Sequence, residues 1–279
     1  MFPAGREQGG IHRMATPPPL SPYVTGPKVY VVGRQTVVQE EVGRFLSDEA
    51  LLFTTDGRAA ADVLTEIAGR TCYMSFGKGR NTNQEYLENI LTSKHGSVLE
   101  HAVWCLLITG VSRSLTHELV RHRAGFGYSQ LSQRYVDESE ARYVVPPLYQ
   151  ESPELRARWE QVIEQLRKAY RELAEASSTF VQQKHPEMAP RDRRKWARQA
   201  ARSVLPNACE TKIFVTGNSR AWRHFLEQRG SPHADTEIRR LAVEIARALK
   251  KESPSIFQDV EVYDEADALP AVRVQHSKV

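Results

Sequence analysis

The longest regular pattern in the chain is a run of apolar residues at helical spacing, and it limits the possible folds more than any other feature. Over residues 152–185, apolar side chains recur every three or four positions, as on one face of an α-helix. Pro186 then ends the pattern, because proline interrupts helical hydrogen bonding. We predict one long helix here and expect its apolar face to pack in the core. The face consists of Leu155, Trp159, Val162, Leu166, Tyr170, Leu173 and Phe180.

Shorter patterns add more helices and a few strands. Apolar, β-branched and aromatic residues at 29–32, 101–111 and 211–216 favour strands. A mixture of helices and a few strands predicts the α/β class, in its mixed α+β form. The last predicted helix has Ser231 as its N-cap and Pro232 in its first turn. The predicted helices cover residues 37–46, 60–69, 83–94, 114–123, 191–204, 219–228 and 232–250.

No shift in composition marks a linker inside the chain, so we predict a single domain over residues 28–264. Residues 1–27 contain two adjacent glycines and a run of three prolines, which favours a disordered arm. Residues 265–279 are predicted to form a loose tail.

The composition excludes several classes of protein. The 279 residues carry a formal net charge of only +4, which permits anionic ligands without requiring nucleic acid. No stretch approaches the roughly 20 apolar residues that span a bilayer, and residues 1–27 lack the apolar core of a signal peptide. Cys72, Cys105 and Cys209 lie far apart, which argues against a disulfide framework or a metal site. We therefore expect a cytoplasmic protein that holds no metal.

The chemically richest segment is residues 121–135, where arginine, histidine, serine, glutamine and tyrosine side chains are concentrated. Arginine recognises anions through paired hydrogen bonds, and glycine at 125 and 127 lets the backbone approach a ligand. A solvated helix end or a basic nucleic-acid patch can also contain such residues. However, the segment lies between apolar elements, where charges generally have partners. It therefore suits a ligand that carries phosphate and a heteroaromatic ring.

The order of the polar motifs resembles that of the flavin-dependent thymidylate synthases. The family signature opens with Arg-His-Arg and closes with Ser-x-Arg, here residues 121–123 and 132–134. Supporting motifs are residues 95–101, the Ala-Arg-x-Val-Leu-Pro stretch at 201–206, residues 218–229 and His233, so the resemblance spans about residues 28–255. It implies a central, mainly antiparallel sheet flanked by long helices, and a homotetramer with sites between subunits. One departure is residues 124–127, which lengthen the signature by one residue.

The resemblance implies the reductive methylation of dUMP to dTMP. Methylenetetrahydrofolate would donate the one-carbon unit, and FAD reduced by NADPH would supply the hydride. A thiolate nucleophile is disfavoured because Cys105 lies between Trp104 and Leu106 in an apolar strand and the other cysteines lack a cationic neighbour. Arg229 would instead sit at N3 and O4 of uracil as the catalytic residue, since arginine stays charged and can stabilise negative charge on the ring.

The same resemblance assigns the binding residues. Arg134 and Arg202 would bind the phosphate of dUMP, Ser132 would donate a hydrogen bond without acting as a nucleophile, and His95 would border flavin and folate. No GxGxxG motif follows a strand, so the flavin would not be bound in the Rossmann manner. The dUMP residues would be Glu118, Leu119, Val120, Arg121, Gln130, Leu131, Ser132, Gln133, Arg134, Arg202 and Arg229. The FAD residues would be His95, Ser97, Arg121, His122, Arg123, Gln130, Asn218, Ser219, Arg220 and His224.

Two alternatives remain open from the sequence. The first is a nucleic-acid-binding module that uses residues 121–123 and the basic stretch 191–198, whose binding should weaken steeply with salt. The second is an oligomeric flavoprotein that modifies another nucleotide.

Overall fold

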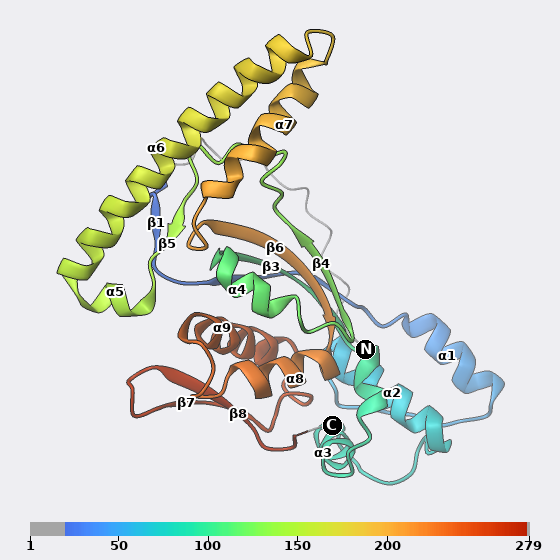
Figure 1. Ribbon diagram of the computed structural model, residues 1–279. Coiled ribbons are helices and arrows are strands. Elements are labelled where there is room, and N and C mark those ends of the chain that lie inside the picture. The colour runs from blue at the N-terminus through green and yellow to red at the C-terminus, as the bar shows by residue number, and fades with distance from the viewer. Residues whose placement is uncertain (1–19, 278–279) are drawn as a thin grey trace.

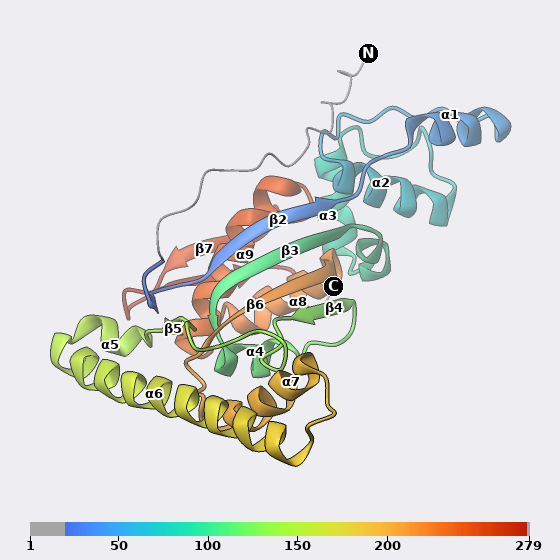
Figure 2. The same ribbon diagram turned by 90° about the horizontal axis from the view of Figure 1, so that it is seen from above.

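The computed structural model describes residues 20–277. A four-stranded sheet forms its centre, in the order β2-β3-β6-β4, and every neighbouring pair is antiparallel (Figure 2). This confirms the prediction of a mixed α/β fold with an antiparallel sheet. Two small sheets accompany it: a parallel β1–β5 pair and an antiparallel β7–β8 hairpin. The strands are β1 Tyr23–Val24, β2 Lys28–Arg34, β3 Val103–Ser112, β4 Phe126–Gln130, β5 Tyr143–Val144, β6 Glu210–Asn218, β7 Val260–Asp264 and β8 Pro270–Val274.

Most of the helices lie on one face of the sheet or beyond its ends (Figure 1). Each of the longer helices begins or ends near the predicted residue. Within the described residues, no helix is both long and apolar enough to cross a membrane. The helices are α1 Gln39–Asp48, α2 Ala60–Tyr73, α3 Asn83–Thr92, α4 Arg113–Leu119, α5 Pro147–Glu151, α6 Pro153–Lys184, α7 Pro190–Ala201, α8 Ser219–Arg229 and α9 Thr236–Glu252, with short 3-10 turns η1 Gly96–His101 and η2 Arg202–Val204.

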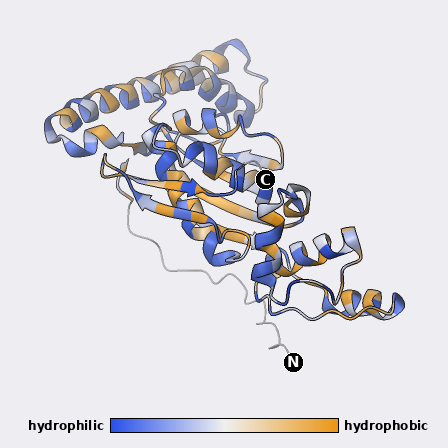
Figure 3. Ribbon diagram, turned by 90° about the horizontal axis from the view of Figure 1, so that it is seen from below, coloured by the Kyte–Doolittle hydropathy of each residue, from blue (hydrophilic) through white to orange (hydrophobic). Residues whose placement is uncertain are grey.

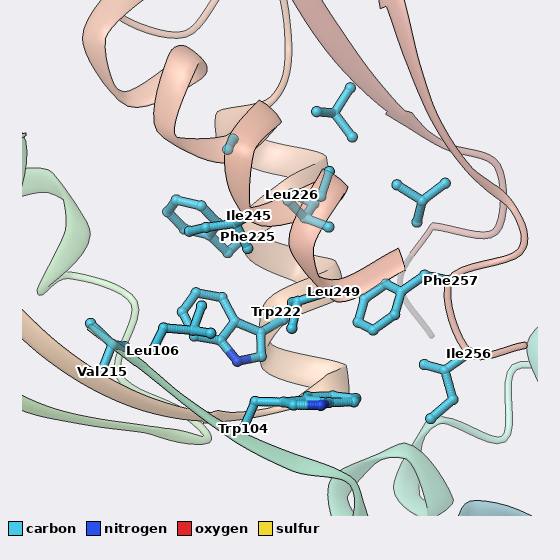
Figure 4. Close-up of a cluster of buried hydrophobic side chains, with 14 of the residues drawn as sticks. Trp104, Leu106, Val215, Trp222, Phe225, Leu226, Ile245, Leu249, Ile256 and Phe257 are labelled. Carbon is cyan, nitrogen blue, oxygen red and sulfur yellow. The ribbon is translucent and has the colours of Figure 1, made fainter. Parts of the chain in front are cut away.

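The core lies on one face of the sheet, under α8 and α9. Strand residues alternate between the two faces, so Leu106 and Val215 point inward and are fully buried. They meet Trp222, Phe225 and other side chains from the helices (Figure 4). Figure 3 shows that hydrophobic residues are concentrated on the strands, whereas hydrophobic and hydrophilic residues alternate along the helices.

The opposite face of the sheet carries apolar side chains that remain partly exposed. Tyr30, Leu107 and Phe214 occupy paired positions on three adjacent strands. Tyr30 is 47% exposed and Phe214 is 38% exposed. We call this row of three residues the outer face.

The apolar face of α6 is less buried than its periodicity predicts. Tyr170 is fully buried, as expected, but Val162 and Phe180 are 52% and 62% exposed. The prediction of core packing is therefore wrong for much of this face. The reason is that α6 and α7 form a hairpin that extends beyond the sheet (Figure 1), so α7 is the main element packed against the far half of α6.

Three predictions about chain ends and helix limits are also corrected. Within the predicted loose tail, residues 270–274 form β8, which pairs with β7 and buries Ala271 and Val272. Within the predicted arm, β1 pairs with β5, while residues 1–19 lie outside the described part. Helix α9 begins at Thr236, because the side chain of Asp235, not that of Ser231, accepts from a backbone N–H of its first turn.

Candidate active site

An open cavity of about 870 Å³ lies beside the Arg-His-Arg motif at residues 121–123. Most of its walls come from three segments: the turn between α4 and β4, helix α8, and the end of the β7–β8 hairpin. Glu100 of η1 adds to them. Its lining includes six residues predicted to bind FAD, together with Arg229. Those six are Arg121, His122, Arg123, Asn218, Arg220 and His224.

The helix that leads into the Arg-His-Arg motif ends earlier than predicted. Helix α4 ends at Leu119, and the backbone N–H groups of Arg121 and His122 then close a tight turn. Gly125 follows with a φ of 74°, which is costly for residues with a side chain. A Cβ at this position would approach the side chains of Asn218 and Ala221 to within 2.8 Å. The left-handed conformation and the close contacts at this position therefore require glycine.

Tyr128 fixes this turn from the neighbouring strand. Its hydroxyl lies 2.6 Å from the carbonyl oxygen of His122 and 3.0 Å from that of Leu119, and it donates to them. Burial raises the pKa of Tyr128 to about 12, so the hydroxyl keeps its proton at neutral pH. No role is predicted for this tyrosine from the sequence, because strand β4 was not predicted; on that strand Tyr128 shares a face with Gln130, two residues later.

Arg229, at the end of α8, is held between two side chains of the α4 region. Its Nη1 donates to Glu118 Oε2 at 2.7 Å, and its Nε donates to His122 Nε2 at 3.0 Å. Burial, followed by the charges of Arg229 and His224, lowers the pKa of His122 to about 4. His122 is therefore neutral near pH 7 and accepts through Nε2. The guanidinium is a fixed positive charge whose side chain is 25% exposed.

The first turn of α8 is built around Asn218. Its side-chain oxygen accepts from the backbone N–H of Ala221 at 2.9 Å, as an N-cap. Arg220 forms an ion pair of 2.6 Å with Glu100, also on the cavity wall. Ser219 has no exposed surface and donates its hydroxyl to the carbonyl oxygen of Leu99. The side chain predicted to contact FAD at position 219 therefore supports the helix end instead.

Other residues predicted to bind substrate line a second, smaller cavity. Gln133 and Arg202 border about 440 Å³ of space together with Arg113 and His117. The latter two are four residues apart on α4 and share a face, a spacing from which the sequence could have identified them. The predicted dUMP residues are thus divided between two cavities of one chain.

The remaining predicted dUMP residues lie on or near β4. Gln130 donates to the hydroxyls of Thr116 and Thr211. Leu131, Ser132 and Arg134 are half-buried after the strand, and the Nε of Arg134 is buried without a hydrogen-bond partner among the described residues. Leu119 is fully buried in the core, which leaves its side chain no access to a ligand, whereas Val120 is exposed.

The predicted flavin residues before β3 stand apart from the larger cavity. His95 is exposed and stacks on Tyr73 with ring centroids 5.8 Å apart. Ser97 is exposed on η1, and neither residue lines the larger cavity. In the part of the chain that the structure describes, no group of three histidine, cysteine or acidic side chains could hold a metal ion.

The fold and the cavity define a mixed α+β protein with a cavity lined by arginine and histidine side chains. Residues 52–255 match the family described as "Thymidylate synthase complementing protein". A flavin-dependent thymidylate synthase of Mycobacterium tuberculosis is 49% identical over 227 residues, which cover 80% of this chain and 88% of that protein. The flavin-dependent thymidylate synthase of Mycobacterium avium is 48% identical over the same shares. The chain therefore belongs to the flavin-dependent thymidylate synthase family, which confirms the resemblance found in the sequence.

Proposed function

We propose that this protein converts dUMP to dTMP, with methylenetetrahydrofolate as the one-carbon donor and FAD reduced by NADPH as the hydride source. The observation that carries the proposal is the larger cavity, which gathers Arg229 with six side chains that the family resemblance assigns to FAD. Membership of the family supports the same reaction.

The side chains around the larger cavity suit FAD. Its volume lies within the usual range of about 300–1,000 Å³ for ligand sites. Arg121 and Arg123 line it. Within the described residues neither forms an ion pair, although the Nε of Arg121 donates to the carbonyl oxygen of His117. Both guanidinium groups can therefore bind the pyrophosphate. When bound, the reduced flavin supplies the hydride that completes the methyl group.

We assign charge stabilisation at the pyrimidine to Arg229. Its guanidinium is positioned by hydrogen bonds to Glu118 and His122. A positive group fixed at N3 and O4 stabilises negative charge that develops on the ring, and this raises electron density at C5. Neutral His122 supports the role, because a protonated imidazole would repel the arginine.

None of the three cysteines lines either cavity, so none is placed for a covalent mechanism. Burial raises the pKa of Cys209 to about 12, so its thiol stays protonated. Cys105 lies within β3 with its sulfur 3.4 Å from the hydroxyl of Thr216. These environments favour electrostatic activation over thiolate addition.

We further propose that copies of the chain assemble into a homotetramer and complete the site between them. The division of the dUMP residues between two cavities supports this, because one chain alone does not bring Arg202 to Arg229. The partly exposed apolar outer face supports it as well.

The test is a spectroscopic and product assay of the purified protein. We expect FAD absorbance that bleaches with NADPH without oxygen, and dTMP formation that requires dUMP, methylenetetrahydrofolate and NADPH together. A protein that binds no added FAD, or that binds FAD but forms no dTMP, would refute the proposal; the second result would favour a flavoprotein with another substrate. Salt-sensitive binding of nucleic acid without flavin would favour the binding module instead.

A further inference from the structure

The β7–β8 hairpin contributes to the larger cavity although it lies beyond residues 52–255, the region that matches the family. Val274, the last residue of β8, and His276 both line the cavity. Figure 1 shows the hairpin packed beside α8 and α9, and Val272 on β8 belongs to the main core. The hairpin is therefore a fixed part of the cavity wall.

A buried ion pair attaches the end of the hairpin to α8. Arg223 is 3% exposed and binds Asp259 through both terminal nitrogens, at 2.7 and 2.9 Å. Such a two-point contact fixes orientation as well as distance. Arg223 also donates to the carbonyl oxygen of Ile256 at 2.8 Å.

The same ion pair holds the backbone of His276 on both sides. The N–H of His276 donates to Asp259 Oδ2 at 2.9 Å, and its carbonyl oxygen accepts from Arg223 Nη2 at 3.1 Å. Two hydrogen bonds from this pair thus fix the backbone of His276, and the residue is half-buried at the cavity. An imidazole on a fixed backbone can make a hydrogen bond without much further loss of conformational entropy.

We propose that His276 is a binding residue for the flavin nucleotide in the larger cavity, and that the Arg223–Asp259 pair positions it. The inference rests on the proposed function, because it takes FAD as the occupant. The imidazole supplies one hydrogen bond to an oxygen of FAD, from a part of the chain to which the sequence motifs assign no ligand.

The experiment compares His276→Ala with Arg273→Ala by titrating apo-protein with FAD and following flavin fluorescence. His276→Ala leaves both backbone contacts intact, so the melting temperature without FAD should not change. We expect its dissociation constant for FAD to rise about three- to tenfold, as for the loss of one hydrogen bond. Arg273→Ala should bind like the wild type, because Arg273 pairs with exposed Glu261 and does not line the cavity. His276→Gln should recover part of the affinity.

The outcomes separate a failure of the role of His276 from a failure of the proposed function. If the wild type binds FAD and His276→Ala binds it equally well, the role of His276 is overturned while the proposed function stands. If the wild type takes up no FAD, the proposed function itself fails. A His276→Ala protein that melts at a lower temperature without FAD, and loses affinity only in proportion, would show a structural role and would also overturn the inference.

Discussion

At the scale of single residues, the geometry of Arg229 makes the sharpest prediction about activity. Replacing Arg229 by alanine should leave FAD bound but lower the rate of dTMP formation by about 10²–10³-fold, as for the removal of one preorganised charge contact. Flavin absorbance of the purified variant and its turnover measure the two effects. Arg247→Ala is the matched control, since Arg247 pairs with Glu244 on the surface of α9 and does not line the larger cavity. Near-normal turnover in Arg229→Ala would refute its assigned role.

His122 predicts a dependence of stability on pH. Its pKa of about 4 in the folded protein lies below the unfolded value of about 6.5, so the unfolded chain binds more protons between these values. The contribution of neutral His122 to the free energy of unfolding should therefore be fully present above about pH 6.5 and be lost as the pH falls towards 4. His122→Gln, which keeps an acceptor for Arg229, should show a smaller decrease in urea titrations at pH 7 and pH 4.5. Equal decreases would contradict the assignment.

The sequence could identify these residues but not their partners. The sequence reveals the arginine and histidine side chains at 121–123 and the arginine at 229, because these residue types are suited to binding anions. The bond between Glu118 and Arg229 joins residues 111 positions apart. Only the packing of α8 against the α4–β4 turn brings them together, and no local pattern encodes that distance.

At the scale of elements, the start of α9 differs from the prediction: Asp235 is the observed N-cap, whereas the sequence predicts Ser231. Asp235→Ala should lower the free energy of unfolding by about 1 kcal/mol, because its carboxylate accepts from the N–H of Glu237 at 2.9 Å. Ser231→Ala should change it by much less, since the helix begins five residues later. Chemical denaturation of both variants tests this. A larger loss in Ser231→Ala would restore the prediction from sequence.

Element positions were otherwise predictable where the periodicity was strong. The strands at β2, β3 and β6 follow from β-branched and apolar runs, and α6 follows from its regular spacing. β4 was missed because Gly125 and Gly127 suggested a loop, although the residues between Phe126 and Gln130 pair with β6 along their whole length. Sheet pairing across distant segments outweighs the weak strand propensity of glycine.

At the scale of the whole molecule, the outer face predicts self-association. Phe214→Lys places a charge among Tyr30 and Leu107, where burial against another copy would be costly. We expect light scattering after gel filtration to show a tetramer for the wild type and smaller species for Phe214→Lys, with an unchanged circular dichroism spectrum. Gln183→Lys, on the exposed surface of α6, is the control for added charge, because it replaces a polar side chain. A monomeric wild type would contradict the proposal.

Burial at this scale was the least predictable property. The spacing of α6 correctly indicated a helix, but periodicity reports only which side chains share a face, not what covers that face. Whether Phe180 meets a core depends on where the α6–α7 hairpin lies relative to the sheet, and that is decided by packing between segments distant in the chain.

The left-handed glycine at position 125 restricts which mutations this turn accepts. Its backbone conformation and the space around it both exclude a side chain. Alanine there would press against Asn218 and loosen the cap of α8, so a single added methyl group would disturb both the turn and the helix beside it.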